Sequence, residues 1–130
     1  MSDLRPTGVT VNFDGKERKL LFSICAIDEL ESEFEKPVLE ILEDMTGKER
    51  RKVITETATI LLNADVECYN LTHNDQKEKL PATYLGTFLT DGIKGGTLDK
   101  MMLKIMEAYE LSMPEEKETD PNRKSGQQSD

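Results

Sequence analysis

The sequence predicts a mostly helical α+β domain, in which an N-terminal β-hairpin precedes four or five packed helices. Apolar and polar residues alternate up to residue 22, and apolar residues then recur at spacings of three and four from residue 24 onward. Glycine or proline separates the helical stretches. A chain of 130 residues can bury one modest core. We expect a flexible N-terminus (1–6), a single globular domain (7–113) and a disordered tail (114–130).

The predicted hairpin spans residues 9–22. Asp14-Gly15 supplies the positive φ angles that a tight hairpin turn needs. On both strands apolar residues alternate with polar ones, as in half-buried strands. The apolar set is Val9, Val11, Phe13, Leu20 and Phe22.

Two short amphipathic helices are expected next. Ser23 is a good N-cap for the first, whose apolar stripe is Ile24, Ile27, Leu30 and Phe34. Cys25 falls within this helix among apolar residues, so we expect it in the core. Pro37 suits the first turn of the second helix. The stripe of that helix is Val38, Leu39, Ile41, Leu42 and Met45.

A third helix is predicted to be the most buried. Thr46 and Glu49 have capping-box spacing, and apolar residues then recur from Val53 to Ala64. Residues 65–79 have no clear period. There we expect Tyr69 and Leu71 to be buried, and Thr72 with Asp75 to cap a short helix.

Two further helices and a tail complete the expected domain. Pro81 suits the start of one helix, and Thr97 the N-cap of the last, with a helix-to-helix turn at residues 91–96. The last helix carries the cleanest stripe, which is Leu98, Met101, Met102, Ile105, Met106 and Tyr109. Residues 114–130 contain no aliphatic or aromatic side chain, so they cannot offset their chain entropy by burial.

Composition excludes several functions. A formal net charge of −9 argues against binding to nucleic acid or to an anionic membrane surface. No run of about 18 apolar residues is present to span a bilayer. The N-terminus has no signal-peptide apolar region, so we expect a cytoplasmic protein in which Cys25 and Cys68 are free thiols.

Catalytic and metal-binding motifs are also missing. A multi-histidine metal site is excluded because His73 is the only histidine. The glycine-rich stretch at residues 91–97 does not have Walker spacing, and Asp65, Glu67 and Asp75 do not have EF-hand spacing. We therefore expect no enzyme, no metal and no cofactor.

Charge is segregated along the chain. Acidic residues crowd the first two helices, whereas Lys48 and three further basic residues cluster at the start of the third. Two interpretations stay open: the basic cluster folds back near the acidic helices, or an acidic face meets a basic edge of another subunit or partner. In the second interpretation, the contact residues are Asp28, Glu31 and Glu35 on the acidic face and Arg50, Arg51 and Lys52 on the basic edge.

Four methionines near the C-terminal end allow a similar pair of interpretations. They are Met101, Met102, Met106 and Met113. At helical spacing such a stripe is typical of ordinary core, yet methionine is also common at adaptable binding surfaces. Met102 and Met106 are the candidates for apolar contacts.

The hairpin and first helices resemble a known family. The segments are VTVNFDGKERKLLF (9–22), AIDELE (26–31) and KPVLEIL (36–42). They are similar to the start of tail assembly chaperones of long-tailed (siphovirus-type) bacteriophages, over roughly residues 7 to 64. The shared features are patterns rather than catalytic residues, so no functional residue is carried over.

The resemblance implies a non-catalytic protein of the infected host cytoplasm. Such chaperones bind the tape-measure protein, recruit tail-tube subunits (the major tail protein), self-associate, and are absent from the finished virion. A structural virion component, such as a head-tail connector or tail-completion protein, is the alternative. An enzyme is the third class, for which the sequence offers least chemistry.

Overall fold

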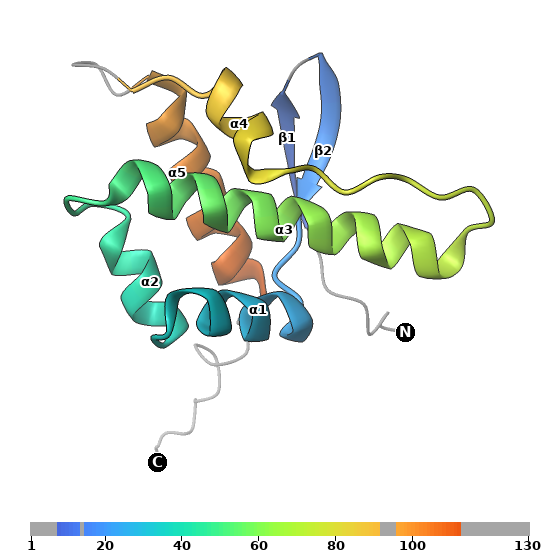
Figure 1. Ribbon diagram of the computed structural model, residues 1–130, viewed down its shortest axis with the longest axis horizontal. Helices are drawn as coiled ribbons and strands as arrows, with labels where there is room; N and C mark the ends of the chain where they lie inside the picture. Colours follow the sequence, from blue (N-terminus) through green and yellow to red (C-terminus); the bar gives the residue numbers. More distant parts are fainter. Residues whose placement is uncertain (1–7, 14, 92–95, 113–130) are drawn as a thin grey trace, which may run out of the picture.

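The computed structural model describes residues 8–13, 15–91 and 96–112. A hairpin of β1 (Val9–Phe13) and β2 (Lys16–Leu20) precedes five helices (Figure 1). The helices are α1 (Ile24–Phe34), α2 (Val38–Asp44), α3 (Arg50–Thr72), α4 (Ala82–Phe88) and α5 (Gly96–Ser112). The predicted α+β, mostly helical fold is thus confirmed. The segments expected to be flexible, 1–6 and 114–130, lie outside the described residues, as does most of the turn predicted at 91–96.

The hairpin has the predicted register. Its strands are antiparallel and pair Val9 with Leu20 and Phe13 with Lys16, around a turn in which Gly15 has a φ of 77°. The second strand ends at Leu20, two residues before the predicted boundary at residue 22. Phe22 leaves the sheet to enter the core, where its ring meets that of Tyr109 edge to face at 5.5 Å.

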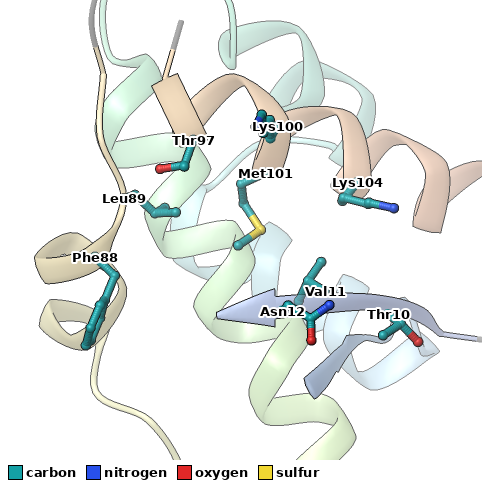
Figure 2. A pocket seen from close by; sticks show the side chains of 9 residues that line it. All are labelled: Thr10, Val11, Asn12, Phe88, Leu89, Thr97, Lys100, Met101 and Lys104. Atoms are coloured by element: carbon teal, nitrogen blue, oxygen red, sulfur yellow. The ribbon is translucent and has the colours of Figure 1, made fainter. Parts of the chain in front are cut away.

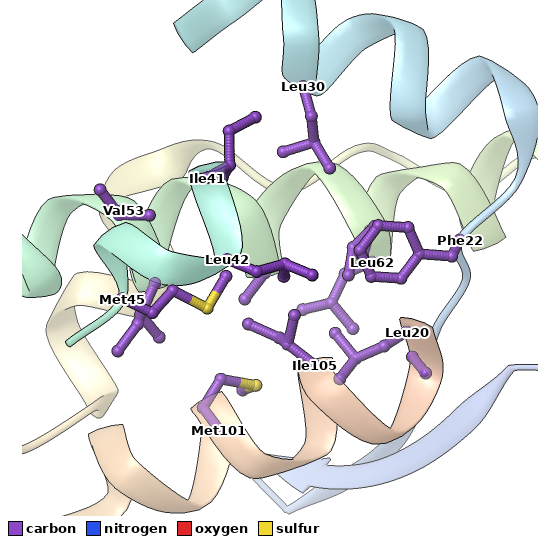
Figure 3. Close-up of a cluster of buried hydrophobic side chains, with 14 of the residues drawn as sticks. Leu20, Phe22, Leu30, Ile41, Leu42, Met45, Val53, Leu62, Met101 and Ile105 are labelled. Atoms are coloured by element: carbon purple, nitrogen blue, oxygen red, sulfur yellow. The ribbon is translucent and has the colours of Figure 1, made fainter. Parts of the chain in front are cut away.

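The long helix α3 organises the core. It crosses the molecule with α1 and α2 on one side and α4 and the hairpin on the other, and α5 also packs on it (Figure 1). Side chains from β2, α1, α2 and α5 converge on it (Figure 3). Leu20, Leu30, Ile41, Ile54 and Ile105 are at most 1% exposed. The apolar periods in the sequence therefore meet in one core.

Helix ends were predicted with mixed success. Ser23 caps α1 as expected, its Oγ accepting from the backbone N–H of Ala26 at 3.1 Å. The predicted capping box is wrong: Thr46 Oγ1 donates to the Glu43 carbonyl at the end of α2, because α2 and α3 are joined by a tight turn. Thr97 does not cap α5 either, since its Oγ1 accepts from the backbone N–H of Thr90.

Four residues expected in the core are exposed. Ile24 and Cys25 lie on the solvent side of α1, because six residues at 100° each place Ile24 roughly 120° around the helix from the buried Leu30. Leu39 is exposed on α2 because that short helix buries only its Val38, Ile41 and Leu42 side. Leu71 is 87% exposed on the last turn of α3, beyond the buried segment of the helix.

Candidate interaction surfaces

The acidic face predicted on α1 is only partly free for contacts. Asp28 and Glu35 are exposed, but Glu31 is half-buried. The backbone N–H of Val38, in the first turn of α2, donates to Glu31 Oε2 at 2.9 Å. Because such N–H groups have no partner within the helix, a carboxylate there accepts a hydrogen bond that would otherwise be missing. Its negative charge also interacts favourably with the positive end of the helix dipole. Glu31 therefore fixes the α1–α2 corner.

The basic edge at the start of α3 has its acidic partners elsewhere than expected. Arg50 Nη1 and Arg51 Nε donate to the two oxygens of Asp91 at 2.8 Å each, and Arg50 Nη2 also donates to Asp99. Hydrogen bonds from Arg51 and Arg50 hold the pKa of the Asp91 carboxyl below its ordinary value. Among the described residues, these two arginines form their ion pairs with Asp91 and Asp99, which lie outside the two acidic helices. They tie α3 to the connection before α5 and to the first turn of α5.

Lys52 points to a different neighbourhood. It is exposed and lines a shallow hollow together with Phe34, Lys36 and Asp44, at the corner between α1, α2 and α3. Lys36 and Asp44 are already paired there at 2.6 Å. Lys52 is thus the basic-edge residue that lies beside the acidic helices, and an intermolecular contact by it stays a prediction.

The methionine stripe faces the core. Met101 is buried, and Met102 and Met106 are half-buried against the core cluster. Two exposed apolar residues of this helix were not predicted from its sequence, Leu103 at 63% and Leu111 at 44% exposure. A leucine off the main stripe of an amphipathic helix is the signal that would have revealed them.

Two asparagines of α3 hold the segment between α3 and α4. Asn63 Nδ2 donates to the Leu80 carbonyl at 2.9 Å and the Leu80 N–H donates to Asn63 Oδ1 at 2.8 Å. Asn70 makes the same pair of bonds with Lys77, at 3.0 and 2.8 Å. Seven helical residues and three extended ones each advance roughly 10 Å, so both pairs fit together. The expectation that Thr72 with Asp75 caps a short helix is wrong, because Thr72 is the last residue of α3 and these bonds hold residues 76–80 extended along α3 (Figure 1).

Tyr69 in the last turn of α3 and His73 and Asp75 just after the helix form a tight cluster. The Tyr69 ring stacks on His73 with centroids 3.7 Å apart, and the Tyr69 hydroxyl donates to Asp75 at 2.8 Å. That hydrogen bond raises the pKa of Tyr69 above its ordinary value. Tyr69, expected to be buried, is half-buried. Tyr69 and His73 therefore have structural partners at the C-terminal end of α3 and in the residues that follow it.

A groove opens between β1, the end of α4 and the first half of α5 (Figure 2). We call it the β1 groove, and its volume is about 420 Å³. Its apolar lining comes from Val11, Phe88, Leu89 and Met101, and its basic lining from Lys100 and Lys104. Figure 2 shows Met101 directed between α5 and β1. No sequence motif marked this groove, because three separate segments form it.

Other kinds of site find no support in the described part of the chain. Within it, no group of three or more His, Cys, Asp or Glu side chains is arranged to hold a metal ion. Nor does any helix there combine the length and apolar character needed to cross a membrane. Comparison of the chain with protein-family models, with curated proteins and with solved structures finds no match.

Proposed function

We propose that this protein is a non-catalytic tail assembly chaperone of a long-tailed phage. In the host cytoplasm it would bind the tape-measure protein and recruit major tail protein subunits, and it would not remain in the virion. The single observation that best supports this proposal is the exposure of large apolar side chains on helices that also carry many charges.

Those apolar side chains are spread over several helices. Ile24 is 78% exposed on α1, Leu39 59% on α2 and Leu103 63% on α5. A chaperone for a long apolar helical protein needs such side chains, because their burial against the client supplies the driving force for binding. The acidic residues around them and the net charge of −9 would keep the free chaperone from aggregating.

The charged contact residues have graded roles in this proposal. Asp28 and Glu35 on the acidic face and Lys52 on the basic edge are exposed and would steer self-association or partner binding. Glu31, Arg50 and Arg51 would contribute less directly, because each already holds two elements of the fold together. Met102 and Met106 would add apolar contact from the half-buried side of α5.

Co-expression with the tape-measure protein of the same phage tests the proposal. We expect the tape-measure protein to be soluble only in the presence of this chain, and the two to co-elute from a sizing column. The double variant Leu103→Ser/Leu111→Ser should lose this effect while its helical circular dichroism is retained. The control Glu107→Ser/Glu110→Ser changes exposed residues of the same helix and should keep it.

Failure would have a clear meaning. If the tape-measure protein stays insoluble and this chain elutes alone, the chaperone function is wrong. Detection of the chain in purified phage particles would then favour a head-tail connector or tail-completion protein.

A further inference from the structure

We propose that the β1 groove binds an extended peptide segment with alternating apolar and acidic side chains, which adds as a third strand to the outer edge of β1. The inference does not rest on the chaperone function, because it concerns a surface separate from Ile24, Leu39 and Leu103. Backbone hydrogen bonding, apolar burial and charge at the groove each support it.

The outer edge of β1 is open for pairing. Among the residues that the structure describes, β1 pairs only with β2. In an antiparallel hairpin with a two-residue loop the pair beside the loop, here Phe13 with Lys16, is the hydrogen-bonded one. Alternation then turns the backbone groups of Thr10 and Asn12 away from β2. No backbone hydrogen bond joins these groups to another element in the described part of the chain. Both residues line the groove, so an incoming strand would find its donors and acceptors there.

The apolar lining of the groove gives such a strand a place for side chains. Val11 and Met101 are buried at its base, Leu89 is half-buried, and Phe88 is 43% exposed at its side. A volume of about 420 Å³ lies within the range of pockets that enclose ligand groups. Every second side chain of an added strand would point toward this lining, which favours apolar residues at alternate positions.

The positive charge of the groove favours acidic side chains at the remaining positions of the added strand. Lys100 and Lys104 are one helical turn apart on α5, both exposed, and among the described residues no acidic one lines the groove. Lys104 Nζ lies 3.8 Å from Glu107 Oε1 in an exposed pair, and Lys100 has no ion pair in the described part of the chain. In a protein of net charge −9 this is a local reversal of sign. Carboxylates on the peptide would therefore complement the groove, whereas they would be repelled by most of the surface.

A fluorescein-labelled octapeptide of alternating valine and glutamate is the probe. We expect saturable binding in fluorescence anisotropy, weakened by salt, and amide chemical-shift changes in Thr10 and Asn12. The variant Lys100→Glu/Lys104→Glu should weaken binding by roughly tenfold or more, as reversal of close charge pairs does at interfaces. The control Lys16→Glu/Lys48→Glu reverses two exposed lysines outside the groove and should leave binding unchanged.

Two altered peptides separate strand addition from simple charge attraction. A peptide with N-methylated backbone amides keeps every side chain but cannot pair with β1, so it should not bind. A peptide with lysine in place of glutamate should also fail. Equal binding of either peptide would overturn the proposal, as would absence of binding by the valine-glutamate probe.

A second copy of the chain, in place of a peptide, would give a different experimental result. If sedimentation shows that the chain dimerises and that Lys100→Glu/Lys104→Glu abolishes the dimer, the groove holds a second copy and the peptide assignment is wrong. Leu103→Ser/Leu111→Ser should leave peptide binding intact, because neither leucine lines the groove. Failure of the chaperone function and failure of the groove are therefore distinguishable.

Discussion

Replacement of Asn63 should destabilise this protein far more than replacement of Asn70, although the two side chains make the same bonds. Asn63 exchanges two hydrogen bonds with the Leu80 backbone in a partly buried setting. Asn70 exchanges two with Lys77 in an exposed one. The difference in burial decides the difference in free energy.

The magnitudes follow from what replaces the lost bonds. In Asn63→Ala, the Leu80 N–H and carbonyl lose their partners where water has limited access, and two such bonds correspond to about 2–3 kcal/mol. In Asn70→Ala, water replaces the side chain, so the free energy of unfolding should fall by only about 0.5–1 kcal/mol. Asn74→Ala is the control, because the Asn74 side chain is exposed and should change stability by less than about 0.5 kcal/mol.

Urea unfolding followed by circular dichroism measures these changes, and amide hydrogen exchange locates them. We expect the Leu80 amide to lose protection in Asn63→Ala, and the Lys77 amide to lose protection in Asn70→Ala. An Asn63→Ala cost no greater than that of Asn70→Ala would refute the reasoning. It would mean that water reaches the Leu80 backbone as easily as it reaches Lys77.

Three further predictions concern charged residues. Glu35 ends α1 with a φ of 57°, a left-handed conformation that glycine adopts more readily than glutamate. Glu35→Gly should therefore raise the free energy of unfolding by about 0.5–1 kcal/mol, as measured by thermal unfolding. The control Glu29→Gly, within the helix, should lower it by a similar amount. Burial raises the pKa of Asp65, so its ionised form opposes folding. Asp65→Asn should therefore stabilise the protein at pH 7, and urea titrations should show the gain vanishing below about pH 4. Hydrogen bonds from Arg51 and Arg50 lower the pKa of Asp91 in the folded protein. The ionised Asp91 carboxylate therefore stabilises the fold at pH values above its unfolded-state pKa, and this stabilisation is lost as the pH falls through its folded-state pKa. Asp91→Asn should lower the free energy of unfolding at pH 7 and make its decrease at acid pH less steep. An unchanged decrease at acid pH would contradict this prediction.

The fold was predictable where the information is local. Alternation of apolar residues located β1, and spacings of three and four located α1 and α5, because each pattern reports which side of its own element is buried. The buried side of each helix was predicted less accurately, because in a short helix such as α1 several different sets of apolar residues share a side. Ile24 was assigned to the wrong one, and only the packing of Leu30 against the rest of the chain fixes the choice.

The remaining features depend on contacts between distant residues. Residues 76–80 have no period of their own, because the positions of Asn63 and Asn70 on a neighbouring helix determine their conformation. Arg50 is 41 residues from Asp91 and 49 from Asp99, a separation that no local pattern encodes. The β1 groove likewise needs β1, α4 and α5 to be assembled before its lysines and apolar side chains come together.

These contacts decide which substitutions can report on partner binding. Reversing the charge of Arg50 would break its bonds to the connection before α5, and replacing Glu31 would leave the Val38 N–H without its acceptor. Lost binding in either variant would therefore mix a weakened fold with a lost contact. Asp28 and Lys52 are exposed, one on each of the two charged surfaces. If Asp28→Lys and Lys52→Glu each abolish an association and the double variant restores it, the acidic face meets the basic edge directly, because a fold defect would not be repaired by adding a second one.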